Sequence, residues 1–393
     1  MNPQILLTIY RKEMLDMIRD RRTLISMIVV PMVAMPLIML AMSYFMSSME
    51  SKAREESTTV GVGQGAVAPA ALEALRGAGF RLVPAADLRR AVERKEVAAA
   101  LEEVGEGKVG RKFVIYADLT RPASQMAASS IRTALDGWKE QEIRRRLKEL
   151  GAPETVLTPF QVTRVNIAPE RKMAGRFWGS ILGYIVLLLM FSGGMYPAID
   201  MTAGEKERRT LEVLLSSPAS RTEIVFGKLL AATTAIFSTA VLTITSLIVT
   251  LRRGGFGQSS AEFREMVSRV PLDAGTIALV FAALLPTAVM AASVMIAVAL
   301  FARSFKEAQS YLTPLVLLVA VPAVAGLLPG MKLTPALAAI PIYNVSQLIK
   351  EIFLGEFSPF LFTVTSATNF LYAAVVFFLA VRIFKNERVL FRS

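Results

Sequence analysis

Long apolar runs with almost no charged residues alternate with polar segments along the chain. The six runs are Thr23–Met46, Phe177–Ile199, Ile224–Leu251, Gly275–Ala302, Ala308–Leu328 and Phe357–Val381. A helix needs roughly 20 apolar residues to cross a bilayer, and each run is long enough. The pattern therefore predicts an α-helical polytopic membrane protein with six transmembrane helices.

The segment before the first run, residues 1–22, has its own pattern. Within Pro3–Asp20 the apolar residues recur at helical spacing, with charged residues between them. Such a helix is expected to lie in the membrane interface before the chain enters the bilayer. Pro3 suits the first turn of a helix. The alternative is a plain cytoplasmic extension of the first span, and we favour the interfacial helix.

The polar stretch between the first two runs, residues 47–176, is long enough to form a domain. Four stretches rich in β-branched and aromatic residues predict strands at Thr58–Gly63, Phe80–Pro84, Lys112–Asp118 and Phe160–Ile167. Three others predict helices at Pro69–Arg76, Ala86–Lys95 and Ala123–Leu150. Strands that alternate with helices are typical of an α/β layer domain. The sequence GVGQG at the first strand lacks the spacing of a dinucleotide-binding loop, so we interpret it as a glycine-rich turn.

Polar residues near and within the runs suggest a path through the membrane. The segment from Leu327 to Phe357 is apolar but broken by three prolines, which predicts short helices over residues 329–357 that dip into the outer leaflet. The pathway candidates, in this segment and in the third run, are Thr234, Ser238, Thr245, Asn344, Gln347 and Glu351. Hydroxyl groups in a span often bond to the backbone of their own helix, so a structural role for the third-run residues stays open.

The charge pattern predicts an orientation. The chain is 53% hydrophobic and carries a formal net charge of +12. Lys and Arg gather before the first run, after the second, after the fourth and after the sixth, which would all lie on one side. The positive-inside rule makes that side cytoplasmic, although the basic loop after the third run argues against it. Both termini would then be cytoplasmic, and residues 47–176 would form an extracytoplasmic domain. The basic residues are explained by membrane edges, so we expect no nucleic-acid partner.

Residues needed for most catalytic sites are absent. The chain has neither histidine nor cysteine, which removes the commonest general base and the thiolate metal ligands. The glycine that a phosphate-binding loop requires is missing before Gly107-Lys108 and Gly227-Lys228. We therefore expect no catalytic residue, no metal site and no ATP site in this chain, and energy for any transport must come from elsewhere.

The charged segment GEKERRTLEVLLSSPASR, from Gly204 to Arg221, separates the second and third runs. Good helix formers predict an amphipathic helix over residues 204–217, with leucines on one face and two i,i+4 charge pairs, Glu205–Arg209 and Arg208–Glu212. The helix should stop before Pro218, and Ser220 with Glu223 should cap the next helix. Three glutamates disfavour binding to anionic lipid, so the pattern favours a protein partner.

This segment resembles the cytoplasmic segment of type-2 ATP-binding-cassette exporter permeases. The matching residues are Glu205, Glu207 or Arg208, Thr210-Leu211-Glu212, Leu214-Leu215, Pro218, Ser220-Arg221 and Gly227-Lys228. The order of the spans and the large insert after the first span are most similar to the NatB-like sodium-efflux branch. The likeness extends over the whole chain, but it is poor evidence for the substrate.

The resemblance implies how such a chain is powered. Residues 204–217 would be a coupling helix that docks into a separate ATPase subunit, which binds ATP and Mg. The coupling residues would be Glu205, Arg208, Leu211, Glu212, Leu214, Leu215 and Arg221. Two ATPase copies and two permease copies, the latter a homodimer, would assemble in a bacterial or archaeal plasma membrane and contact its lipid. The substrate would be sodium or an amphiphilic, lipid-like or drug-like molecule. The alternative function is a non-transporting membrane protein that relays a signal from its extracytoplasmic domain.

Overall fold

The structure is a computed structural model, and it describes residues 2–63, 67–107, 110–151, 170–253, 270, 272–325, 328 and 331–386. Contacts divide the chain into two units. Met1–Met42 and Ile167–Ser393 form one, which we call the membrane unit, and Ser43–Asn166 form the other, which we call the insert domain. Each is described by itself below.

Six helical segments within the described residues are long and apolar enough to cross a membrane. They are Arg21–Ser57, Trp178–Glu207, Arg221–Arg252, Ala274–Ala299, Phe305–Val324 and Pro359–Lys385. Their main helices are α3 (Val30–Ser57), α7 (Glu170–Ile199), α10 (Arg221–Arg252), α12 (Ala274–Ala299), α13 (Phe305–Ala325) and α15 (Pro359–Lys385). The first begins with α2 (Arg21–Leu24) and a π-helical stretch, η1 (Ile25–Val29). A mostly helical chain with six candidate spans agrees with the prediction of a polytopic membrane protein.

Helix α12 lies at the centre of the membrane unit and packs against α7, α10, α13, α14 and α15. Its buried face is rich in alanine, including Ala288, Ala291 and Ala292. Small side chains let helix backbones approach closely where the hydrophobic effect contributes little. Pro286 lies inside α12 without ending it, as expected for a proline whose neighbours satisfy the freed carbonyl.

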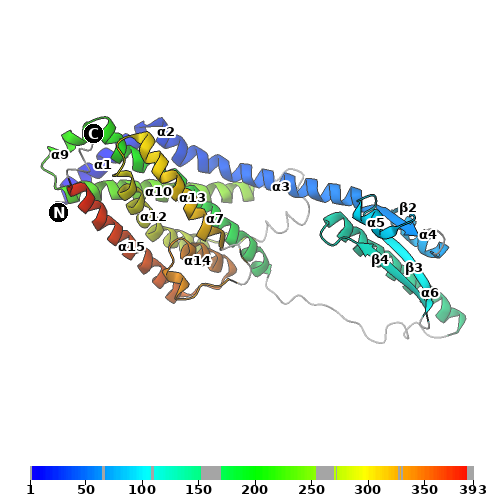
Figure 1. The fold of residues 1–393 in the computed structure, drawn as a ribbon. Coiled ribbons are helices and arrows are strands. Elements are labelled where there is room, and N and C mark those ends of the chain that lie inside the picture. The colour runs from blue at the N-terminus through cyan, green and yellow to red at the C-terminus, as the bar shows by residue number, and fades with distance from the viewer. Residues whose placement is uncertain are drawn as a thin grey trace. The chain divides into compact units, whose positions relative to one another are not determined.

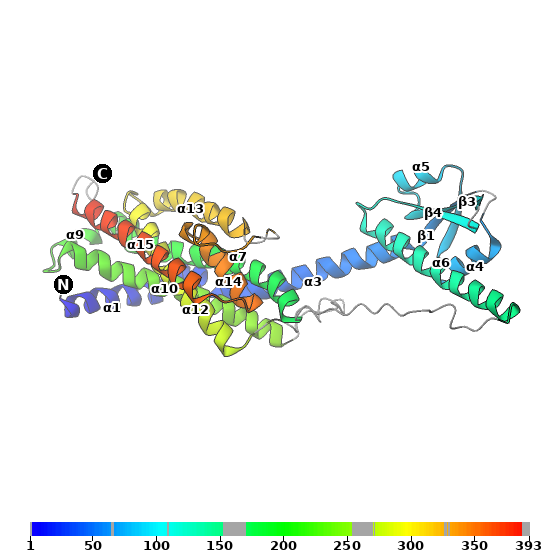
Figure 2. The ribbon, with the colours of Figure 1, turned by 90° about the horizontal axis from the view of Figure 1, so that it is seen from below.

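The segment after α13 forms short helices, as the prolines predicted. A 3₁₀ turn, η4 (Leu337–Ala339), is followed by α14 (Tyr343–Leu354). Helix α14 is too short to cross a bilayer, and it packs tightly on α7. A Cβ atom at Gly179 would lie 2.9 Å from Cβ of Phe353 and 3.0 Å from Cα of Lys350, so only glycine permits this approach. Helix α14 lies at the opposite end of the membrane unit from the segment that joins α7 to α10 (Figures 1 and 2).

The predicted N-terminal helix is present as α1 (Pro3–Arg19), with Asn2 as its cap and Pro3 at its first position. It packs along α10 rather than standing apart from the spans. Gly227 makes this packing close, because a Cβ atom there would lie 2.6 Å from Cγ2 of Ile9. The hydroxyl groups of Tyr10 and Thr234 add a hydrogen bond of 3.2 Å between the two helices.

The insert domain contains a four-stranded sheet of order β2-β1-β3-β4. The strands are β1 (Thr59–Gly63), β2 (Arg81–Ala85), β3 (Ala99–Gly107) and β4 (Gly110–Ala117). Strand β1 runs parallel to β2 and β3, whereas β4 is antiparallel to β3. Helices α4 (Pro69–Gly77) and α6 (Pro122–Glu149) cover one face, and α5 (Leu88–Glu93) covers the other (Figure 2). Strands β1, β2 and β4 and the three helices lie where the sequence predicted them.

The strand β3 was not predicted, although it is the central strand against which β4 pairs. Its sequence, AALEEVGEG, starts with alanines and continues with glutamates and glycines, which are depleted in strands. Burial on both faces overrides that preference, since Ala99 packs with the α4–α6 side and Ala100 with the α5 side. The fourth predicted strand, Phe160–Ile167, lies outside the described residues.

Candidate coupling site

The predicted helix over residues 204–217 is broken into two short pieces. Helix α7 continues through a π-helical stretch, η3 (Asp200–Gly204), into α8 (Glu205–Glu207). The chain then reverses at Arg209, whose φ of 60° lies in the left-handed region, and α9 (Thr210–Leu215) follows. A residue other than glycine in this conformation costs about 1 kcal/mol or more. The predicted i,i+4 pairs therefore do not form, and Glu205 and Arg208 have other partners.

Glu205 points into the protein and meets a lysine from the third span. The Nζ atom of Lys228 donates to Oε2 of Glu205 at 2.7 Å, to Oε1 of Glu13 at 2.8 Å and to the Met201 carbonyl at 2.7 Å. All three charged side chains are at least 96% buried. Lys228 thus joins α1, α8 and α10 in one ionic contact.

Lys12 supplies the second positive charge. Its Nζ atom bonds to Oε1 of Glu205 and lies 3.1 Å from Oε1 of Glu13. Burial lowers the pKa of Lys12, but the nearby carboxylates of Glu13 and Glu205 outweigh that effect, so the pKa lies above its ordinary value of 10.5. Two lysines and two glutamates therefore form a neutral cluster, which we call the ionic quartet; Glu13, Glu205 and Lys228 are buried in it and Lys12 is partly exposed. Removal of one member of such a cluster leaves an uncompensated buried charge.

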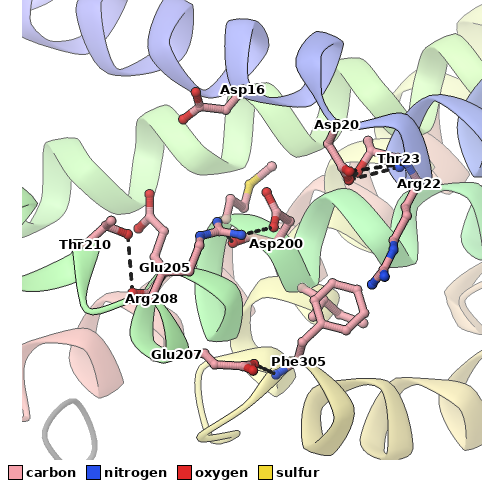
Figure 3. A network of polar contacts seen from close by, with 12 residues as sticks. Asp16, Asp20, Arg22, Thr23, Asp200, Glu205, Glu207, Arg208, Thr210 and Phe305 are labelled. Carbon is pink, nitrogen blue, oxygen red and sulfur yellow. Dashed lines mark hydrogen bonds and ion pairs between the residues drawn. The ribbon is translucent and has the colours of Figure 1, made fainter.

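The other charged residues of α8 reach a different pair of helices. The ammonium of Lys206 donates to the carbonyls of Leu300 and Ala302, at the C-terminal end of α12, where a positive charge is favourable. The carboxylate of Glu207 accepts from the backbone N–H of Phe305 at 2.7 Å, at the start of α13 (Figure 3). The three residues of α8 thus contact four helices of the membrane unit.

Arg208 stabilises the turn at Arg209 by a contact with Asp200. Its guanidinium lies 2.7 Å from Oδ1 of Asp200 (Figure 3). Thr210 donates its hydroxyl to the Glu205 carbonyl at 3.3 Å. These contacts bridge the turn that Arg209 opens, and they explain how a left-handed residue is tolerated there.

Helix α9 buries one side and exposes the other. Leu211 is buried in the core of the membrane unit, and Leu214 and Leu215 are half-buried against it. Glu212 and Val213 are exposed, and Val213 leaves 72% of its surface accessible. The leucine face that was predicted to meet a partner therefore packs on this chain, and the outward face of α9 consists of the residues between the leucines.

The next helix begins as predicted. Ser220 caps α10 through its hydroxyl, and the Glu223 carboxylate accepts from the Ser220 backbone N–H, so the capping box is confirmed. Arg221 donates to the carbonyl of Lys385 at the end of α15. The end of the last span therefore lies beside the start of the third.

A cavity of about 390 Å³ opens beside the quartet. Its walls come from α1, the end of the second span and the start of α9, and its lining residues are Lys12, Glu13, Asp16, Arg19, Asp20, Asp200, Met201, Glu205, Arg208 and Thr210. Carboxylates outnumber cations in this lining. Among the residues that the structure describes, no three acidic side chains are grouped closely enough to hold a metal ion.

The predicted pathway residues fall into two separate groups. Thr234 bonds to its own helix at the Leu230 carbonyl and to Tyr10, Ser238 is half-buried, and Thr245 is exposed. Of these three residues, Thr234 therefore uses its hydroxyl in structural hydrogen bonds within the membrane unit.

The second group lies on α14, where Asn344 and Gln347 are buried and Glu351 is half-buried. Asn344 donates to Oδ1 of Asn369 at 3.1 Å, and Asn369 donates to the hydroxyl of Thr287 at 3.1 Å. Gln347 is fully buried, and neither its amide nitrogen nor its amide oxygen has a hydrogen-bond partner among the described residues. Glu351 accepts from the backbone N–H of Leu333 at 3.0 Å. The two groups are not brought together into one site.

Sequence reasoning missed Lys12, Glu13 and Lys228 as site residues. One signal was present, since Lys228 lies inside the apolar run Ile224–Leu251. A charged residue within a membrane span usually has a partner and a function. The two partners on α1 were hidden by a distance of more than 190 residues along the chain.

Comparison with known proteins shows the family to which the chain belongs. Residues 7–389 match the family described as ABC-2 family transporter protein. The chain belongs to this family. It is 28% identical over 400 residues to the ABC transporter permease protein NatB of Bacillus subtilis (strain 168), an alignment that covers 97% of this chain and 98% of that protein. No solved structure matches the chain significantly. As a member of the ABC-2 family, the chain is a multi-pass membrane permease.

Proposed function

We propose that this ABC-2 family member is the non-catalytic permease subunit of an ATP-driven exporter, and that a separate ATP-binding-cassette ATPase docks on α9. The proposal rests on one difference within Gly204–Leu215: some of its side chains contact this chain and others are exposed. The side chains of α8 and Leu211 are committed to contacts within the chain, whereas Glu212 and Val213 are exposed. An exposed apolar side chain next to a charge suits the edge of a protein contact.

The contacts of α8 connect α9 mechanically to the helices of the membrane unit. A displacement of α9 would pull on α8, which bonds through Glu205 to α1 and α10 and through Lys206 and Glu207 to the α12–α13 turn. Ionic and hydrogen-bonded contacts of this kind keep their partners together when an element shifts as a body. In this account Glu205 is a transmitting residue inside the permease rather than a contact to the ATPase.

The proposed working unit contains two permeases and two ATPases, with ATP and Mg on the ATPase subunits. We place α9 and both termini in the cytoplasm and the insert domain outside, which is supported by the basic residues at the α9 end of the spans. Arg19, Arg221 and Lys385 all lie there.

Transport explains the spans better than a signal relay does. A relay needs only packed apolar helices, whereas the membrane unit buries a chain of amide and hydroxyl groups at Thr287, Asn369 and Asn344. Buried polar groups in spans often mark a substrate path. For the substrate we propose sodium ion or an amphiphilic molecule, the first supported by the resemblance to the sodium-efflux branch.

The test uses the permease reconstituted in vesicles with the ATP-binding-cassette ATPase of its own host. We expect Val213→Asp to reduce ATP-driven export by about tenfold, because it removes an apolar contact and adds a buried charge. The matched variant Val213→Ile should retain export. Flux of radioactive sodium and of a fluorescent amphiphile would be measured in parallel. Unchanged export by Val213→Asp would contradict docking at α9, and export of neither substrate would contradict the substrate proposal.

A further inference from the structure

The insert domain carries a groove along the open edge of its sheet. The groove encloses about 660 Å³ and is lined by three residues of β4 and eight of α6. They are Arg111, Phe113, Ile115, Arg132, Leu135, Asp136, Trp138, Lys139, Glu142, Ile143 and Arg146. No residue of β3 contributes to it. The groove therefore lies over the outermost described strand and extends past it, beneath the second half of α6.

The floor of the groove is apolar and partly aromatic. Phe113 and Trp138 meet edge to face, with ring centroids 6.0 Å apart. Ile115 and Leu135 are half-buried beside them. The first half of α6 buries Ala127 and Ile131 in the sheet core, whereas the second half meets β4 through Trp138 and has no buried residue. An aromatic surface of this kind is a common anchor for a bound chain.

The dimensions of the groove match one extended chain segment. On α6 the lining runs from Arg132 to Arg146, about 21 Å at the rise of an α-helix. An extended segment of about six residues has the same length. Strand β4 pairs with β3 on one side only. No backbone hydrogen bond to its other side is found among the described residues. An edge strand with free N–H and C=O groups is a template for strand addition.

The net charge of the groove indicates what charge a bound peptide segment should carry. Four of its lining residues are cationic and two are carboxylates. Arg132 and Arg146 are mostly exposed at the rim. Asp136 pairs with Lys139 and Arg132, and Glu142 pairs with Arg146, so the two carboxylates are shared among three of the four cations. Arg111 pairs with Glu103 outside the lining. The excess positive charge therefore favours a partner with acidic side chains.

We propose that this groove binds an extended acidic peptide segment of a partner, which adds to the edge of β4 as a fifth strand. Its apolar side chains would pack on Phe113 and Trp138, and its acidic side chains would face Arg132 and Arg146. This function of the insert domain is separate from the docking of an ATPase on α9. It would let the permease recognise a polypeptide without any change in the membrane unit.

The test measures hydrogen exchange and binding with the full-length protein in lipid nanodiscs. The probe is a short synthetic peptide that alternates glutamate and valine, and the control peptide has lysine in place of glutamate. We expect the acidic peptide to bind and to slow exchange at alternate amides of β4, since strand addition protects every second N–H group. The lysine peptide should bind at least about tenfold more weakly.

Two variants test the site itself. Arg132→Glu with Arg146→Glu should weaken the acidic peptide by about tenfold or more. The matched control is Arg89→Glu, an exposed arginine on α5, which covers the other face of the sheet. It should leave binding unchanged. Because all three arginines are exposed, the fold should survive each change.

Other occupants give different results, and each overturns the proposal. Decanoate that binds as tightly as the acidic peptide, with no protection of β4, would make the groove an amphiphile site. Slow exchange of β4 before any peptide is added would mean that this chain or a second copy already fills the groove. Absence of binding by the acidic peptide would equally reject it.

Discussion

Replacement of Lys228 by methionine is the sharpest perturbation of the membrane unit. The change keeps the length of the side chain but removes three hydrogen bonds, to Glu13, Glu205 and the Met201 carbonyl. Both carboxylates would stay buried with only Lys12 beside them. Breaking a buried ion pair costs about 3–5 kcal/mol, and we expect the lower end of that range because Lys12 still compensates one charge.

The assay is thermal unfolding of the purified protein in nanodiscs, followed by tryptophan fluorescence at one scan rate. A loss of about 3 kcal/mol corresponds to a fall in Tm of about 6 °C, with about 2 °C per kcal/mol for a chain of this size. Arg253→Met, at the exposed end of α10, is the matched control, and its Tm should change by less than about 1 °C.

A second variant separates lost charge balance from lost packing. Lys228→Met with Glu205→Gln leaves Lys12 opposite Glu13, which restores neutrality. We expect this double variant to regain about half of the lost Tm, because one buried charge has been removed with its partner. The account of the quartet would be refuted if Lys228→Met alone unfolded at the wild-type temperature, or if Glu205→Gln made the variant less stable still.

Three further predictions concern other contacts. Gly227→Ala should lower Tm by a few degrees, since its Cβ atom would meet Ile9 at 2.6 Å. Adding Ile9→Ala to this variant should restore part of the lost Tm in the same unfolding assay. Asn369→Leu should destabilise by about 1–3 kcal/mol, because it leaves Asn344 and Thr287 without a shared partner, whereas the exposed Thr245→Leu should unfold like wild type. Asp20→Ala should cost about 1 kcal/mol, because Asp20 caps α2 through Thr23. Burial raises the pKa of Asp20, but the hydrogen bonds from Thr23 outweigh this effect and hold the pKa below its ordinary value of 3.8. The stability difference between Asp20→Ala and wild type should therefore be present at neutral pH and should vanish as pH falls through that lowered pKa.

The sequence was sufficient for the elements whose physics is local. The six candidate spans follow from run length, and the start of α1 at Pro3 and the cap at Ser220 follow from residue type. Strand β3 was missed because burial on two faces, which the sequence does not display, overrides its poor strand preference.

The segment between the second and third spans was predicted as one helix, and the structure divides it into α8 and α9. Helix formers at Glu205–Leu215 predicted one helix, and the competing contacts of Lys228 and Asp200 favour a reversal at Arg209 instead. Glu205 looked like a surface residue because its partners are distant along the chain. Only the packing of α1 on α10 brings Lys12 and Lys228 to the same carboxylate.

The absence of cysteine from the chain allows the most direct measurement of docking at α9. Val213→Cys creates a single thiol on the exposed face of α9, and Leu7→Cys creates one on the exposed face of α1. Each variant would be assembled with the ATPase of its host in nanodiscs and treated with a short thiol-to-amine cross-linker. We predict a permease–ATPase adduct from Val213→Cys and at most a trace from Leu7→Cys. Equal adducts from both positions, or none from Val213→Cys in an assembled complex, would contradict the central claim that α9 receives the ATPase.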